Sequence, residues 1–345
     1  MSRNWRILLT ATVAALLTAA VLVAPSGAAG GGTAQASCTA ATNIEAIVDD
    51  SISMDFTDEN KLRVQAMDLL INALPDGTQL GAVQFGSSFD PATPSASPVF
   101  PVEAIGPNAA AMKSALGTQI QGDDGGTDYN AAFDTARAAN PGAGARIFLT
   151  DGGHNSGTYN NTHLNPAPQA QTPTYVIGFS AGLAGPEDQA RLAKIASDTG
   201  GRYFPLPDSS ALQSVMNEIE TTLSCQTPPK TFNDTLSQGK SKAHSVKISS
   251  KSKSAQLALS WTSPLDKFTI SGIKVVRSGK VVAKAAKHKK PKKLKVKVKT
   301  GSTFAVIKVQ RLVKGTLKFK VKAATIGSGQ PKVTLTTQVS QSRRR

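Results

Sequence analysis

Apolar residues follow two different periodic patterns along the chain. Up to about residue 224, short apolar runs alternate with segments whose apolar residues recur every three or four positions. The runs are typical of strands covered on both faces, and the longer segments of amphipathic helices. The predicted strands are 43–49, 79–85, 146–150 and 174–178, with an edge strand at 203–204. The predicted helices are 58–74, 109–116, 129–139, 186–199 and 209–223. This alternation predicts an α/β fold with a doubly wound, mostly parallel sheet.

After residue 229 the apolar residues recur at every second position. Segments 254–261, 293–299 and 317–322 alternate, and in the last two Leu, Val and Phe fall on one face and Lys on the other. This pattern predicts a separate all-β domain, an antiparallel sandwich with one solvated face. The aromatic residues of this region fall mostly at core positions and do not predict a platform for stacking bases. They are Phe232, Trp261, Phe268, Phe304 and Phe319.

The N-terminal segment has the order of a secretory signal peptide. Arg3 and Arg6 precede an apolar stretch at 7–23, and small residues follow, with cleavage expected after Ala28 or Ala36. The stretch is shorter than the roughly 20 residues that span a bilayer, which leaves an uncleaved anchor as the alternative. We therefore expect an exported protein, secreted or held at a cell surface. The expected division is a signal peptide and linker at 1–36, an α/β domain at 37–228, a β domain at 229–342 and a basic tail at 343–345.

The two cysteines bracket the α/β region. Cys38 follows the predicted signal peptide, and Cys225 lies just before the basic region begins. In an oxidising compartment a disulfide between them is the default expectation. Two free buried thiols are the alternative.

The formal net charge of +16 conceals two regions of opposite charge. From Lys230 onward there are 29 basic and two acidic residues, whereas the preceding residues include 10 basic and 21 acidic ones. On an exported protein, such a basic domain predicts adhesion to polyanions, for example wall polymers or anionic lipid headgroups, without sequence-specific binding of nucleic acid. Two alternatives are that the lysines guard strand edges against aggregation, or that the basic domain docks on the acidic one. Segment 284–293 is predicted to be an exposed basic hairpin loop.

Three oxygen-rich clusters stand where predicted strands end or a helix begins. They are the segments 49–53 (Asp-Asp-Ser-Ile-Ser), 125–128 (Gly-Gly-Thr-Asp) and 150–153 (Thr-Asp-Gly-Gly). Ligands of doubly wound sheets bind at the carboxyl ends of the strands, so we expect these clusters to lie near one another. Carboxylates and hydroxyls without Cys or His are donors suited to Mg²⁺ or Mn²⁺, and they are too few to saturate the ion. The alternative is that each cluster is merely a turn or a helix cap.

These clusters, in this order and spacing, resemble the metal-ion-dependent adhesion site of von Willebrand factor type A domains. Segment 192–204 is also similar to the end of that fold, and the resemblance covers about residues 40–224. It implies that Ser51, Ser53 and Thr127 contact the metal through their hydroxyls, and that Asp49 and Asp151 act directly or through water. In the family, a carboxylate from a protein partner commonly fills the open coordination position. Bacterial members often have Gly where this chain has Ile52.

The beginning of the basic region, residues 236–261, weakly resembles bacterial pre-peptidase C-terminal jelly-roll modules. The acidic, cation-binding features of those modules are missing here, so the resemblance implies no metal site in this region.

A serine hydrolase is an alternative, because residues 178–182 match the pattern G-x-S-x-G around Ser180. A nucleophile elbow needs a helix directly after the serine, whereas 183–186 predicts more loop, and the triad would need His244 or His288 from the basic region. His154 and His163 are interpreted as surface loop histidines without fixed partners. We therefore expect no enzyme but a binding protein with a divalent cation, a carboxylate-bearing protein partner and a basic domain on anionic surfaces. The remaining alternative is a structural scaffold whose ion only holds the loops together.

Overall fold

The computed structural model describes residues 40–86, 94–122, 125–160, 172–179, 185–206, 211–225, 230–285, 292–329 and 332–341. Several predictions therefore lie outside the described residues: the signal peptide, Cys38, most of the basic hairpin loop and the basic tail. The Cys38–Cys225 bridge stays a prediction for this reason. Among the described residues, no helix has the length and apolarity needed to cross a membrane.

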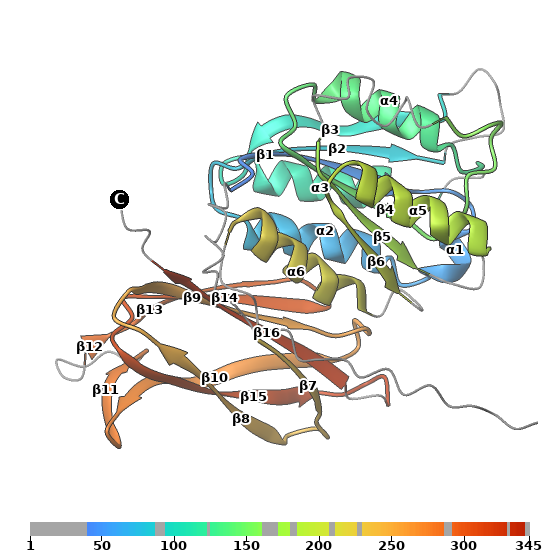
Figure 1. Cartoon of the computed structure of the whole chain (residues 1–345). Coiled ribbons are helices and arrows are strands. Elements are labelled where there is room, and N and C mark those ends of the chain that lie inside the picture. Colours follow the sequence, from blue (N-terminus) through green and yellow to red (C-terminus); the bar gives the residue numbers. More distant parts are fainter. Residues whose placement is uncertain are drawn as a thin grey trace, which may run out of the picture. The chain divides into compact units, whose positions relative to one another are not determined.

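The α/β region is built on one six-stranded sheet, sheet A, with strand order β3-β2-β1-β4-β5-β6 (Figure 1). All neighbouring strands are parallel except β2 and β3, as the predicted fold requires. The antiparallel edge strand β3 was not predicted, because Pro98 and Pro101 interrupt its pattern; prolines are tolerated on edge strands. The strands are β1 (Asn43–Asp49), β2 (Gln79–Phe85), β3 (Ala96–Ala104), β4 (Ala145–Thr150), β5 (Thr174–Phe179) and β6 (Arg202–Leu206).

Helices cover both faces of sheet A (Figure 1). They are α1 (Met54–Thr57), α2 (Leu62–Ala73), α3 (Ala109–Gln119), α4 (Tyr129–Ala139), α5 (Pro186–Asp198) and α6 (Leu212–Leu223). Apolar residues of α2, α3 and α6 share one buried cluster with Ile44 and Ala46 of β1, whereas α4 and α5 pack on the opposite face with Ile47. Since successive side chains of a strand point to opposite faces, the unbroken apolar run of β1 serves both layers.

The predicted helix at 58–74 begins later than expected. Asp58 precedes α2, and its carboxylate accepts hydrogen bonds from the backbone N–H groups of Leu62 (2.7 Å) and Arg63 (2.9 Å). A side chain that satisfies the first free N–H groups of a helix lies just outside it. The short helix α1 occupies part of the loop before it.

The basic region forms two five-stranded sheets. Sheet B has the order β13-β14-β9-β16-β7, and sheet C the order β12-β11-β10-β15-β8. All neighbouring pairs are antiparallel except the short pair β11–β12, which agrees with the predicted all-β fold. The strands are β7 (Lys230–Thr235), β8 (Ser241–Ile248), β9 (Ser252–Ser260), β10 (Lys267–Arg277), β11 (Lys280–Lys284), β12 (Lys292–Lys293), β13 (Lys295–Thr300), β14 (Phe304–Gln310), β15 (Gly315–Thr325) and β16 (Lys332–Gln341).

The alternating pattern has different consequences in two lysine-rich strands. In β15 the apolar residues Leu317, Phe319 and Val321 are buried, and the lysines between them are exposed, as predicted. In β13 the same pattern leaves Val298 59% exposed. The reason is position, because β13 is the edge strand of sheet B whereas β15 lies between β10 and β8 inside sheet C. The predicted buried face of segment 293–299 is therefore confirmed for Leu294, which is buried, and for Val296, which packs against the core, but it is wrong for Val298.

One outward face of the sandwich is covered. Ala258, Phe304 and Val306 of sheet B belong to the same buried cluster as residues of α2 and α6. Amide side chains add polar contacts: Gln213 donates to the Thr303 hydroxyl (2.6 Å), and Gln338 donates to the backbone carbonyl of Asn217 (3.1 Å). Contacts of this kind, apolar and amide, depend little on the opposite net charges of the two regions.

Candidate metal centre

Three loops meet at the carboxyl edge of sheet A. Asp49 is the last residue of β1, and the loop that follows carries Ser51 and Ser53; the loop before α4 carries Thr127, and the loop after β4 carries Asp151. Strands β1 and β4 are paired neighbours in the middle of the sheet, so the first and third loops leave it side by side. This is the position at which doubly wound sheets bind their ligands.

Hydrogen bonds join the side chains of these loops. The Asp49 carboxylate accepts from the Ser51 backbone N–H (2.9 Å) and from the Thr150 hydroxyl (2.6 Å). The Ser51 and Ser53 hydroxyl oxygens lie 3.1 Å apart, and Ser53 donates to Oδ1 of Asp151 (2.8 Å). Four of the residues predicted from the sequence thus form one connected network.

The fifth residue, Thr127, borders the same space. A Cβ atom placed on Gly152 would lie 3.6 Å from Oγ1 of Thr127 and 3.7 Å from Oγ of Ser53. The missing side chain of Gly152 therefore leaves room between these two hydroxyls. Thr127 and Ser53 border this opening, and Ser53 connects it to the network of Asp49, Ser51 and Asp151. Of the five predicted residues, Ser53 is half-buried and the other four are buried.

The backbone fixes the loops to one another. The Ile52 N–H donates to the carbonyl of Gly125 (3.2 Å), which ties the first loop to the second. The Thr127 N–H donates to Oδ1 of Asn155 (2.7 Å), and the Asn155 N–H donates to the Thr127 carbonyl (3.0 Å), which ties the second loop to the third. Gly86 at the end of β2 has a φ of +115°, and a Cβ there would meet the Ser51 nitrogen at 2.3 Å, so the first loop requires glycine at this position.

The adjacent acidic residues serve the scaffold. Asp50 is buried and receives Nη2 of Arg63 at 2.7 Å and the backbone N–H groups of Gln121 (3.0 Å) and Gly122 (2.9 Å). Arg63 also reaches Asp58 at 3.2 Å. Arg63 therefore joins the two ends of the loop between β1 and α2, and Asp50 joins that loop to the loop after α3.

Burial makes the two site carboxylates unfavourable as free anions. Burial, together with the nearby negative charge of Asp151, raises the pKa of Asp49 to about 7, against hydrogen bonds from Ser51 and Thr150. The pKa of Asp151 is also raised by burial, although Thr57 and Ser53 donate to it. A divalent cation between two such carboxylates would favour their ionised forms.

The donor set fits a hard divalent cation. Among the described residues, no three His, Cys, Asp or Glu side chains gather where they would hold a metal by themselves. The set consists instead of two carboxylates and three hydroxyls, which are oxygen donors of the kind that Mg²⁺ and Mn²⁺ take. Five protein oxygens do not fill six positions, so one would remain for water or for a partner.

Sequence reasoning missed several residues that support the site. The Thr57 hydroxyl donates to Oδ2 of Asp151, Thr150 donates to Asp49, and Asn155 pairs with Thr127. No local pattern marks Thr57 or Asn155, and although Thr150 begins the cluster 150–153, its supporting role could not be predicted; all three have partners from other loops. The interpretation of His154 as a residue without a fixed partner is wrong: its Nδ1 accepts from the Tyr129 N–H (3.1 Å).

The described part of the chain offers no support for a hydrolase. Ser180, His163 and His288 lie outside the described residues. His244 is buried in the sandwich, where Nε2 lies 2.6 Å from Oδ2 of Asp234 and the ring packs against Phe232 and Phe319.

Comparisons with known proteins identify the family of the α/β region. The sequence profile of the von Willebrand factor type A domain matches residues 43–218. No curated protein sequence matches the chain. The family match ends before the sandwich, so the jelly-roll resemblance of the basic region is not confirmed.

Solved structures that are similar include three proteins. A von Willebrand factor type A protein from Catenulispora acidiphila is 18% identical, with 87% of this chain and 65% of that chain covered and a TM-score of 0.42. Proximal thread matrix protein 1 from the mussel byssus, with a zinc-occupied metal-ion-dependent adhesion motif, is 16% identical. The match covers 59% of this chain and 51% of that chain, with a TM-score of 0.41. The manganese-loaded TRAP protein of Plasmodium vivax is 18% identical. The match covers 60% of this chain and 87% of that chain, with a TM-score of 0.39. The chain thus spans less than two thirds of the length of the first two.

Proposed function

Because the chain belongs to the von Willebrand factor type A domain family, we propose that it is a secreted adhesion protein that binds a partner through a divalent cation. Asp49, Ser51, Ser53, Thr127 and Asp151 hold Mg²⁺ or Mn²⁺, and the remaining position accepts a carboxylate of an extracellular protein. The observation that supports this most directly is the connected network of Asp49, Ser51, Ser53 and Asp151 beside the opening at Gly152.

The roles of the residues follow from their contacts. Asp49 and Asp151 supply negative charge, directly or through water, and the hydroxyls of Ser51, Ser53 and Thr127 complete the oxygen set. Thr150 and Thr57 donate to the two carboxylates and orient them. The bound cation attracts an anionic oxygen of the partner, and binding is reversible exchange of that oxygen with water; no covalent step is involved.

Apolar side chains next to the site suit a protein partner. Ile52 is 42% exposed and Phe56 is 74% exposed, and both belong to the segment that carries Ser51 and Ser53. An exposed aromatic ring adds contact area around a central polar anchor in many protein interfaces. We include Phe56 in the contact surface, since a lone carboxylate–metal contact would give little specificity.

Calorimetry of Mg²⁺ and Mn²⁺ binding tests the metal site. We expect Asp49→Ala to abolish binding of both ions, because it removes one of two carboxylates. Asp55→Ala is the matched control: it removes the same charge from an exposed position of the same segment and leaves binding unchanged. Equal binding by the parent and Asp49→Ala would refute the site.

A second measurement separates adhesion from a purely structural ion. The parent chain is used to capture extracellular proteins with Mg²⁺ present and with a chelator, while circular dichroism monitors its fold. Adhesion predicts that capture is lost with the chelator although the fold persists. Capture that is unchanged by the chelator would assign the ion a structural role.

The sandwich contributes a second contact in this proposal, with anionic polymers of a surface. Its two acidic residues are buried and internally paired. Asp234 lies between His244 and Lys242, and Asp266 accepts from Gly327 and Ser328. Neither one therefore offsets the other basic residues of this region.

A further inference from the structure

The two outward faces of the sandwich differ. The face of sheet B packs against α2 and α6, as described above. The outward face of sheet C carries a group of lysines that we name the lysine face. It consists of Lys247, Lys274, Lys284, Lys318, Lys320 and Lys322, whose side chains are exposed or half-exposed.

Register places these six lysines on one side of the sheet. His244 of β8 pairs with Phe319 of β15, and both are buried, so the residues on either side of them point outward. Lys318 pairs with Lys274 of β10, which in turn pairs with Lys284 of β11. A row of cations along β15 thus meets a row that crosses three strands.

Protection of a strand edge does not explain the row on β15. Edge strands commonly carry lysine to block pairing with another chain. Strand β15, however, is paired on both sides, with β10 and β8, so it has no free edge. The similar lysine row on β13 does lie on an edge strand, and edge protection accounts for it.

The row on β15 carries an electrostatic cost. Lys274 and Lys318 are directly opposed on neighbouring strands, and like charges in this position are destabilising. Among the described lysines of sheet C, the one ion pair with a carboxylate is that of Lys242 with Asp234, at the margin of the sheet. An anion bound from outside would relieve this repulsion.

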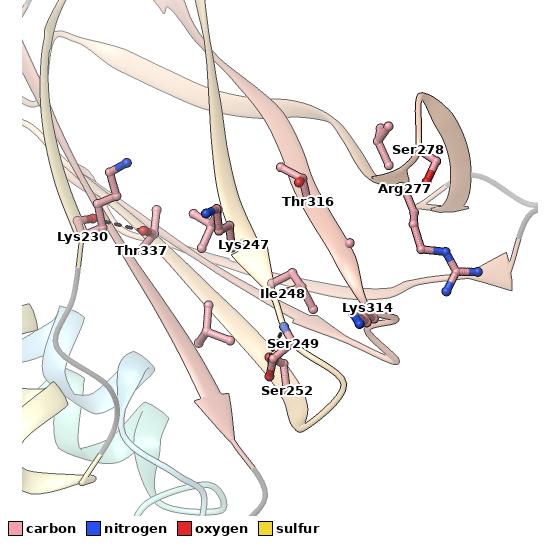
Figure 2. A pocket seen from close by; sticks show the side chains of 14 residues that line it. Lys230, Lys247, Ile248, Ser249, Ser252, Arg277, Ser278, Lys314, Thr316 and Thr337 are labelled. Atoms are coloured by element: carbon pink, nitrogen blue, oxygen red, sulfur yellow. Dashed lines mark hydrogen bonds between the residues drawn. The ribbon is translucent and has the colours of Figure 1, made fainter.

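Short side chains leave the row accessible. Lys318 and Lys320 face Ser245 and Ala243 on β8, and Lys320 faces Ser271 on β10. At the irregularity of β10 near Gly272, these residues line a hollow of about 660 Å³. A second hollow, of about 630 Å³, lies at the first residues of β15, and residues of both sheets line it. Figure 2 shows Lys247, Thr316 and Lys314 among its lining residues.

We propose that the lysine face binds a linear polyol-phosphate polymer that lies along β15. This rests on the proposed function, in which the sandwich holds anionic surface polymers. Outward lysines two residues apart are spaced about 7 Å along a strand. A polyol phosphate with six backbone bonds per repeat presents its charges about 7 Å apart when extended.

Chemistry favours this polymer over nucleic acid. Single-stranded nucleic acid is held by aromatic rings on which bases stack, in addition to cations. The outward positions between the lysines are instead Ser, Thr and Ala, and Phe319 points into the core. Hydroxyls and ammonium groups bind phosphate oxygens, but none of these side chains provides a ring on which a base could stack.

The test measures binding of poly(glycerol phosphate) to the full chain at low salt. The first variant is K318Q/K320Q/K322Q on β15. The second, K295Q/K297Q/K299Q on β13, is the matched control, because it removes the same charge with the same spacing from an edge strand. We expect the first variant to bind at least tenfold more weakly and the second to change affinity less than threefold. The slope of log affinity against log salt should also fall by about 2 in the first variant.

Each other outcome has a defined meaning. Equal weakening in both variants would overturn the lysine face and leave a diffuse electrostatic attraction, which keeps the proposed function. If the parent binds the polymer no better than neutral dextran, both the lysine face and the proposed contact of the sandwich with anionic surface polymers are overturned. Tighter binding of a single-stranded oligonucleotide with the same number of phosphates would replace the polymer with nucleic acid. If the first variant loses its fold, as judged by circular dichroism, K320Q alone and the salt dependence of the parent provide the same comparison.

Discussion

Glu45 provides a quantitative test of the electrostatics beneath the candidate site. Its side chain lies on β1, fully buried, against Gly81 of the paired strand β2, where a Cβ atom would come within 2.3 Å of Oε2. Burial raises the pKa of Glu45 from 4.5 to about 8, although Asn140 and the charge of Arg146 oppose the shift. The folded chain therefore keeps a proton that the unfolded chain releases near pH 4.5.

The sign of the effect follows from this difference. The contribution of Glu45 to stability is fully present below pH 4.5 and is lost as the pH rises toward 8, because ionising the buried carboxyl costs free energy. Each pH unit between these values corresponds to about 1.4 kcal/mol. Between pH 5 and pH 8, Glu45 alone therefore lowers the free energy of unfolding by about 3 to 4 kcal/mol.

We expect Glu45→Gln to remove this loss. At pH 5 the variant and the parent should differ by less than about 1 kcal/mol, since a protonated carboxyl and an amide have similar shapes. At pH 8 the variant should be the more stable by about 3 kcal/mol. Urea unfolding followed by far-ultraviolet circular dichroism, in chelator, measures both values. Glu103→Gln on the half-buried edge of the same sheet is the control. Parallel pH curves for the parent and Glu45→Gln would refute the reasoning.

Three further predictions concern the site. Arg63→Ala should lower the free energy of unfolding by about 3 to 5 kcal/mol, because it leaves Asp50 and Asp58 buried without their partner; a loss below 1 kcal/mol in urea unfolding would contradict this. Gly152→Ala should leave the fold intact, since the added Cβ meets its neighbours at ordinary contact distance. It should weaken Mg²⁺ binding at least tenfold in calorimetry, because the Cβ fills the space between the donors Ser53 and Thr127. An unchanged Mg²⁺ affinity would place the ion elsewhere. Phe56→Ser should leave the Mg²⁺ affinity unchanged and reduce chelator-sensitive capture of the partner, because the ring is exposed beside the site; undiminished capture would remove Phe56 from the contact surface.

The sequence predicted best those elements whose pattern is set locally. The bounds of β1, β2 and α4 agree with the predicted ranges, because abrupt changes between apolar and polar residues mark their ends. Strand β3 escaped prediction because its prolines argue against a strand in the middle of a sheet, and its place at the edge is a property of the whole fold. Strands β13 and β15 show the same limit: their alternation is alike, and only the neighbours of each strand decide which apolar face is buried.

Some residues of the candidate site could likewise be predicted from the sequence, and others could not. The five oxygen donors stand in short motifs at strand ends, so the sequence alone indicated them. Thr57 and Asn155 could not be predicted because each acts on a residue from another loop; Thr150 stands in the motif 150–153, but its bond to Asp49 could not be predicted for the same reason. Arg63 carried no signal either, since a buried arginine between two aspartates looks like an ordinary charged helix position until the loops are folded.

The pairing of β1 with β4 has a consequence for where the ion is acquired. Asp49 and Thr150, which share a hydrogen bond across these strands, are 101 positions apart along the chain. A polypeptide threaded through a membrane in extended form keeps such distant segments apart, so it cannot bring an ion with it. For a chain exported as proposed above, loading would then occur on the far side, after the sheet has closed, and its metal content would reflect the medium outside the cell.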